Sequence, residues 1–188
     1  MWKGSMSLLK NILTFCIPIV MLLGIDGPKQ RLPEKQYQVK AAFLYNFTQF
    51  VEWPDSAFSE ANAPLIIGVV GEDPFGSYLE EVVAGEQMNG HPLIVKRFND
   101  DEEITTCHIL FVSVKSKNSS EKIIERTKGK SILTVSDIPT FLQNGGMIRF
   151  ISVNNKIQFQ INPGASISAD LKISSKLLRL AEIVTPNE

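Results

Sequence analysis

The residues with the strongest claim to chemistry form the short segment 71–76, with the sequence GEDPFG. It follows the apolar run 65–70, which predicts a buried strand, and precedes residues 77–83, whose apolar positions repeat at helical spacing. A glycine-bounded turn between a strand and a helix places backbone N–H groups and the helix dipole where they favour an anion. The candidate ligand-binding residues of this turn are Gly71, Asp73, Phe75 and Gly76.

The same turn also has a purely structural explanation. It lacks both the glycine spacing of dinucleotide-binding loops and the lysine of a P-loop. Asp73 can serve as a helix N-cap and Pro74 as a first-turn residue. Ser136 stands at a comparable strand end, after residues 131–135, so it joins the ligand-binding candidates with the same capping alternative. Both interpretations stay open at the level of sequence.

No catalytic or metal-binding pattern is evident. Cys107 and His108 are adjacent, but neighbouring side chains on a strand point to opposite faces, so they cannot easily share a metal ion. His91 is the only other histidine, and no CxxC or HxxH spacing occurs. No GxSxG motif is present, and no serine has an obvious histidine and aspartate to complete a triad. We therefore expect no enzymatic activity, no cofactor and no metal.

Cations near the carboxyl end form a second candidate site. Arg149 interrupts an apolar strand, and Lys176 and Arg179 lie on the polar side of the amphipathic segment 171–184. These residues could meet carboxylate or phosphate groups of a partner, and ordinary surface charge is the alternative. The formal net charge of −1 shows no electrostatic footprint for nucleic acid. The acidic run 100–103 is most simply a solvated loop.

The first residues indicate export. Lys3 and Lys10 precede an apolar run that ends at Gly24 and is too short for a comfortable membrane span. This is the pattern of a secretory signal over residues 1–27, and an uncleaved N-terminal anchor is the alternative. In either case the folded part is expected to lie outside the cytoplasm. A linker over residues 28–35 and a folded domain over residues 36–188 are expected to follow.

Cysteine usage allows no internal disulfide in the exported part. Cys16 belongs to the signal, which leaves Cys107 alone in the mature chain. Cys107 opens the apolar run 107–114, so we expect it to be unpaired and buried as a small hydrophobic residue.

The elements that must position these residues indicate an α/β fold. Segment 36–54 carries Val39, Phe43, Phe47 and Phe50 at helical spacing, with Leu44, Phe47 and Val51 as a second stripe. It predicts a core helix that ends at Trp53-Pro54. Further expected strands are 92–98, 107–114 and 131–135, with helices at 119–126 and 138–142, a hairpin of 147–153 with 157–161, and a closing helix over 171–184. We predict a single three-layer domain with a mixed, mostly parallel sheet of five or six strands flanked by helices.

Several blocks of this sequence, in order over about 150 residues, resemble the YfiR family. The blocks are residues 40–47, 51–54, 71–76, 107–111, 133–137, 145–148 and 173–181. The resemblance implies a periplasmic protein without catalytic activity that binds an inner-membrane diguanylate cyclase and holds it inactive. Cyclic di-GMP output and biofilm formation would then depend on an outer-membrane lipoprotein that sequesters the repressor.

The resemblance leaves open which membrane protein is the partner and whether the chain senses a ligand. Related domains are joined to histidine kinases, so the chain could instead be a sensor module that takes an anionic or nucleotide-like ligand at residues 71–76. A homodimer is also left open. The best-known member of the family carries two disulfides. Cys107 corresponds to one of those cysteines, but Gly68 stands at its partner's position and the second pair is absent, so redox control through a disulfide is not expected.

Overall fold

A computed structural model gives the structure, which describes residues 32–99, 104, 106–114 and 117–186. The helices, one of them a short 3-10 helix (η1), are α1 (Leu32–Phe50), η1 (Asp55–Ala57), α2 (Tyr78–Val83), α3 (Lys117–Thr127), α4 (Pro163–Ser168) and α5 (Ser175–Leu180). The strands are β1 (Val51–Glu52), β2 (Leu65–Gly71), β3 (Gln87–Met88), β4 (His91–Phe98), β5 (Ile109–Ser113), β6 (Leu133–Ser136), β7 (Ile148–Val153), β8 (Lys156–Ile161), β9 (Lys172–Ile173) and β10 (Glu182–Ile183). The predicted signal or anchor, residues 28–31 of the predicted linker and the acidic run 100–103 lie outside the described residues.

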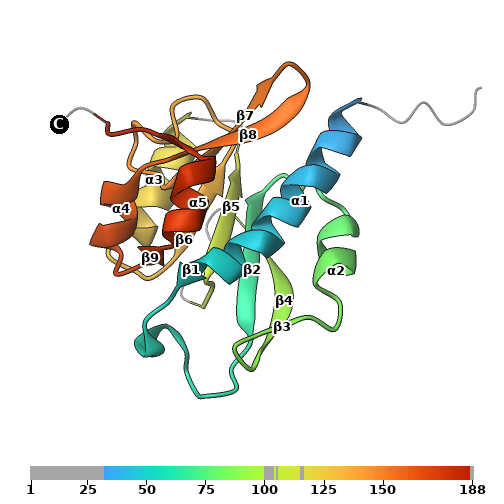
Figure 1. Ribbon diagram of the computed structural model, residues 1–188, viewed down its shortest axis with the longest axis vertical. Helices are drawn as coiled ribbons and strands as arrows, with labels where there is room; N and C mark the ends of the chain where they lie inside the picture. The colour runs from blue at the N-terminus through green and yellow to red at the C-terminus, as the bar shows by residue number, and fades with distance from the viewer. Residues whose placement is uncertain (1–31, 100–103, 105, 115–116, 187–188) are drawn as a thin grey trace, which may run out of the picture. The chain divides into compact units, whose positions relative to one another are not determined.

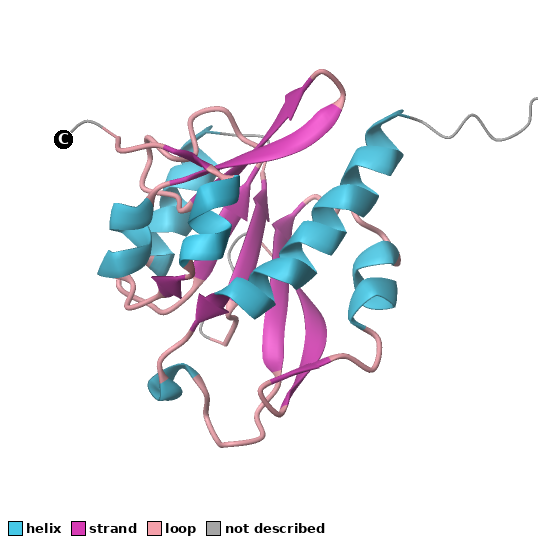
Figure 2. Cartoon of the chain, viewed as in Figure 1, coloured by secondary structure: helices cyan, strands magenta, loops and turns pink. Residues whose placement is uncertain are grey.

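Eight strands form one sheet in the order β10-β8-β7-β6-β5-β2-β4-β3, and β1 pairs separately with β9. Strands β4, β2, β5, β6 and β7 are parallel, whereas β8 is antiparallel to β7 and β3 is antiparallel to β4. Figure 1 and Figure 2 show helices on both sides of this sheet. The predicted α/β fold with a mixed, mostly parallel sheet is confirmed. Eight strands replace the expected five or six because two-residue edge strands such as β3 and β10 carry no periodic pattern.

Helix α1 covers one face of the sheet with a stripe spaced by three residues. Ala41, Leu44 and Phe47 are completely buried. Phe47 stacks on Phe150 of β7, with 5.9 Å between the ring centroids. Val39 is 44% exposed, so its assignment to the buried stripe is wrong. The reason is geometric, because a residue two positions before Ala41 lies on the opposite side of the helix. The helix also begins at Leu32, inside the stretch predicted as linker.

The other face of the sheet is covered by α3. Ile123 of α3 belongs to a buried cluster with Leu110 and Val112 of β5 and with Phe141. The segment 138–142 forms consecutive turns rather than the predicted short helix. Gly145 and Gly146 follow soon after it, so helical bonding has little room to propagate. Among the described helices, none combines the length and the apolar character needed to cross a membrane.

The prediction of one closing helix over residues 171–184 is wrong. The segment contains β9, the short helix α5 and β10. The Ser174 side chain accepts a hydrogen bond from Leu177 N and starts α5 at that point. On either side the chain is extended, because β9 pairs with β1 and β10 pairs with β8. Pairing with distant strands therefore overrides the helical pattern of the segment.

Candidate functional site

The turn 71–76 leaves β2 at a point where the order of the strands reverses. The next long strand along the chain, β4, pairs on one side of β2, and β5 pairs on the other. In open α/β sheets, ligands commonly bind outside the carboxyl ends of the strands at such a point. Gly71 has φ +90°, and Glu72 N donates a hydrogen bond to Ser113 O across the edge at 2.9 Å. A Cβ at position 71 would lie 2.3 Å from that oxygen, so glycine is required there.

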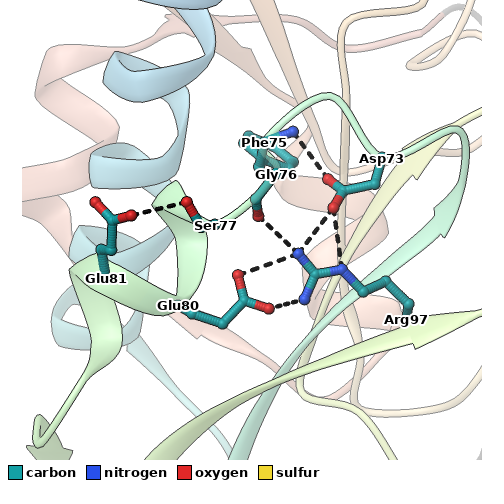
Figure 3. Close-up of polar contacts among 7 residues, drawn as sticks. All are labelled: Asp73, Phe75, Gly76, Ser77, Glu80, Glu81 and Arg97. Atoms are coloured by element: carbon teal, nitrogen blue, oxygen red, sulfur yellow. Dashed lines mark hydrogen bonds and ion pairs between the residues drawn. The ribbon is translucent and has the colours of Figure 1, made fainter.

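Arg97 of β4 holds the turn together (Figure 3). Its Nε and Nη2 donate to Asp73 Oδ2 at 3.0 and 2.8 Å, and Nη2 also donates to Gly76 O at 2.8 Å. Its Nη1 forms an ion pair with Glu80 of α2. The other oxygen of Asp73, Oδ1, accepts a hydrogen bond from Phe75 N at 2.8 Å. The guanidinium therefore joins the turn, α2 and the neighbouring strand.

The structure corrects the capping roles predicted for this turn. The N-cap of α2 is Ser77, not Asp73, and its side chain makes no capping hydrogen bond. Ser77 Oγ instead donates to Glu81 Oε1 at 2.7 Å (Figure 3). The Asp73 carboxylate accepts a hydrogen bond from the backbone N–H of Phe75, two residues later, and this contact forms an Asx-turn. Phe75 is buried and meets Phe111 of β5 edge to face, with centroids 4.8 Å apart. Phe75 is therefore a core residue beneath the turn.

The charges of this turn are mainly negative. Its carboxylates and those of α2 belong to Glu72, Asp73, Glu80 and Glu81. Arg97 bonds two of these groups, Asp73 and Glu80. An anion placed here would lie among carboxylates and would compete with Asp73 and Glu80 for the guanidinium of Arg97. The prediction that residues 71–76 bind an anion stays a prediction, and this charge balance weighs against it.

Ser136 lies away from the turn. It ends β6, which is separated from β2 by β5. Its buried hydroxyl donates to Val112 O at 2.6 Å and accepts from Ile138 N at 3.2 Å. Both bonds tie the end of β6 to its own neighbours. Ser136 thus has a structural role in the turn after β6, and β5 lies between β6 and the strand that leads to the turn 71–76.

The next residue, Asp137, is part of a polar cluster that the sequence reading missed. Lys40 of α1 is buried and forms an ion pair with Asp137, with Nζ 2.6 Å from Oδ2. Tyr37 donates its hydroxyl to the same oxygen at 2.9 Å. Burial, and then the neighbouring carboxylate of Asp137, raises the pKa of Tyr37 to about 12. The cluster fastens the first half of α1 to the carboxyl edge of β6. A lysine beside the apolar stripe of a core helix is the sequence signal that could have indicated it.

The three candidate interaction cations do not come together. Arg149 shares β7 with Phe150, and adjacent residues of a strand point to opposite faces. Phe150 packs in the core beneath α1, so Arg149 lies on the face that α3 covers, where Nη1 donates to Gln160 Oε1 at 3.2 Å. Lys176 and Arg179 are exposed on α5, whose Leu177 packs into the core beneath α1. The structure therefore separates Arg149 from the other two cations.

Cys107 is a free, buried thiol, as the sequence predicts. Burial raises the pKa of the Cys107 thiol, which keeps it protonated and unreactive at neutral pH. A Cβ at Gly68 would lie 3.2 Å from Cys107 Sγ, so residue 68 does stand at a disulfide-partner position. The Phe98 ring takes that space, with Cε2 only 2.7 Å from the same Cβ position.

His108 belongs to an aromatic stack that is centred on Phe58. The Phe58 ring lies between the rings of His108 and His91, with centroid distances of 4.4 and 3.8 Å. His108 Nδ1 accepts a hydrogen bond from Ile66 N at 3.1 Å, and Trp53 Nε1 donates to His108 O at 3.1 Å. The stack thus joins the chain after α1 to β2 and β5. Burial lowers the pKa of His108 to about 4.

The lowered pKa of His108 predicts a loss of stability in mild acid. In the unfolded chain the imidazole takes up a proton near pH 6.5, whereas in the folded protein it does so only near pH 4. The contribution of neutral His108 to the free energy of unfolding is therefore fully present above pH 6.5. It is lost as the pH drops from 6.5 to 4, by at most about 1.4 kcal/mol per pH unit. Urea unfolding from pH 7 to 4 measures the slope. His108→Gln should lower the stability at pH 7 and flatten the slope, and an unchanged slope would refute this role.

The described residues contain no group of three or more histidine, cysteine or acidic side chains that could hold a metal ion. The sequence model of the YfiR/HmsC-like family matches residues 37–182. The chain belongs to this family. The match runs from Tyr37 on α1 to Glu182 on β10, so it includes each of the candidate residues of this YfiR/HmsC-like protein. No curated protein matches the chain.

Proposed function

We propose that this YfiR/HmsC-like protein is a periplasmic regulator without catalytic activity, which binds the periplasmic part of an inner-membrane diguanylate cyclase and holds that enzyme inactive. The family match over residues 37–182 carries the proposal. The export pattern of residues 1–27 supports it. The buried state of Cys107 and His108 supports it too, because neither side chain is placed to act on a substrate. An outer-membrane lipoprotein that sequesters the regulator would relieve the repression.

The contact with the cyclase is best supported at the carboxyl-terminal elements. Three large apolar side chains are exposed there, Ile167 on α4 at 73%, Leu180 on α5 at 72% and Ile183 on β10 at 49%. We call them the apolar patch. Lys176 and Arg179 are exposed on α5, the helix that carries Leu180. Apolar side chains with a cationic rim are typical of protein interfaces, and they fit a partner surface with apolar residues and carboxylates.

The test introduces a charged side chain into the apolar patch. Leu180→Glu should weaken binding of the cyclase at least tenfold, because a carboxylate would be buried in an apolar contact. Crosslinking in the envelope of the host, followed by identification of the retained proteins, measures the binding. The cellular level of cyclic di-GMP measures the function, and we expect it to rise both in this variant and on deletion of the gene.

Ile94→Glu is the matched control. Ile94 is also exposed, at 42%, but it lies on β4 near the other edge of the sheet. This variant should keep both the crosslink and the low level of cyclic di-GMP. If deletion of the gene leaves cyclic di-GMP unchanged and no membrane signalling enzyme is retained, the proposed function is wrong. If deletion of the gene raises cyclic di-GMP but Leu180→Glu behaves as the parent protein does, the proposed function stands and the location of the contact is wrong.

A further inference from the structure

A cavity of about 850 Å³ lies between the carboxyl-terminal end of α3, the turn 142–147 and α4. Its size falls within the range of pockets that bind small molecules. Glycines and alanines of the turn and of α4 form part of its wall, so backbone groups are accessible from inside. The cavity lies away from the turn 71–76, since none of its lining residues comes from β2 or α2.

The lining of this cavity includes polar groups that are deeply buried. Thr134 of β6 is 2% exposed and Asn162 is 7% exposed. The Asn144 amide nitrogen is buried and has no hydrogen-bond partner. This nitrogen is out of reach of a water-sized molecule, so the part of Asn144 that lines the cavity consists of its other atoms.

Thr134 and Asn162 can donate to the same ligand. Thr134 Oγ1 accepts a hydrogen bond from Met147 N at 3.2 Å, and a hydroxyl that accepts still has a proton to donate. Asn162 Oδ1 accepts from Ala165 N at 3.2 Å, which leaves the NH₂ end of this amide as its donor end. Two uncharged donor groups thus belong to residues of one cavity wall.

The charges of the cavity lie at its rim. Lys128 and Glu125 line it, but their side chains are 75% and 76% exposed, and they lie 3.9 Å from each other. The buried groups are amides and a hydroxyl, and these provide no counter-charge for an ion. We infer that this cavity binds an uncharged polar molecule, such as a monosaccharide or a small amide, through carbonyl or hydroxyl oxygens placed against Thr134 and Asn162. The inference does not depend on the identity of the repressed enzyme.

A panel of defined probes tests the inference on the purified full chain. Glucose, N-acetylglucosamine and acetamide are the neutral probes, and inorganic phosphate and acetate are the ionic ones. At ten times its Kd, a neutral probe should raise the melting temperature by about 3 to 5 °C. Ligand-observed NMR at millimolar concentration provides a second measure of binding. Binding of phosphate or acetate in place of every neutral probe would overturn the inference, as would no binding by any neutral probe.

Two variants locate the binding. Thr134→Val removes the hydroxyl at similar volume, and Gly164→Phe places a ring at the cavity wall. A Cβ at Gly164 would contact only Asn162 Oδ1, at 3.4 Å, so this variant should fold. Both variants should lose the response, while Asn62→Leu, at an exposed position outside the lining, should keep it. A response that persists in both cavity variants would place the ligand elsewhere. The cyclic di-GMP assay is independent of this one, so each proposal can fail alone.

Discussion

Gly71→Ala should lower the free energy of unfolding by about 3 kcal/mol or more, a large share of the stability of a single domain. Two costs combine at this position. The φ of +90° is a backbone conformation that L residues with a side chain rarely adopt. The new Cβ would also lie 2.3 Å from Ser113 O, and this oxygen cannot move away because it belongs to the backbone of β5 and accepts the hydrogen bond from Glu72 N. Urea unfolding at pH 7 measures the loss.

Gly76→Ala is the matched control, because it separates the two costs. Gly76 also has a positive φ, +56°, but a Cβ there would have no atom within 4 Å. Only the conformational cost applies, so we expect a loss of about 1 kcal/mol. Equal losses in the two variants would show that the close approach of β2 to β5 is not what fixes Gly71. A small loss in both would mean that the turn can rearrange.

The two glycines show how far the sequence predicts the turn. A strand, a glycine-bounded turn and a helix could be placed from the apolar run 65–70 and the spacing that follows. The role of Arg97 could not, because it lies 24 residues from Asp73 and reaches it only when β4 pairs in parallel beside β2. Sequence patterns report local periodicity. They do not report which strand becomes the neighbour, and that pairing decides the electrostatics of the candidate site.

The prediction of a closing helix at the carboxyl-terminal end was wrong for a related reason. Residues 171–184 carry apolar side chains at helical spacing, and Leu177 is buried as that pattern predicts. Leu180 belongs to the same pattern but is 72% exposed, because the chain leaves the helix after it and extends to pair with β8. A helix of six residues depends on tertiary contacts more than on propensity, so the pattern alone cannot set its length. The same exposure provides the apolar patch of the proposed interface.

The ion pair between Lys40 and Asp137 leads to the second large effect. Asp137→Ala should lower the free energy of unfolding by about 3 kcal/mol, because it leaves a buried ammonium without its carboxylate. The Lys40 side chain is only 7% exposed, so water cannot replace the lost partner. The Tyr37 hydroxyl loses its acceptor at the same time. Because the pair is largely shielded from solvent, 1 M NaCl should change this loss very little.

A double variant, Lys40→Met with Asp137→Ala, decides whether this loss comes from the unpaired charge of Lys40. Lys40→Met keeps most of the apolar stem and removes the ammonium, so alone it should cost about 1 kcal/mol. Asp137 is less affected by the loss of Lys40, since its side chain is 28% exposed and Tyr37 still donates to it. In the double variant no buried charge is left without a partner. We expect it to be about 2 kcal/mol more stable than the sum of the single losses predicts. Strictly additive losses in urea unfolding would mean that Asp137 acts through its turn after β6 and not through Lys40. In that case the ion pair does not contribute to holding the first half of α1 against the sheet.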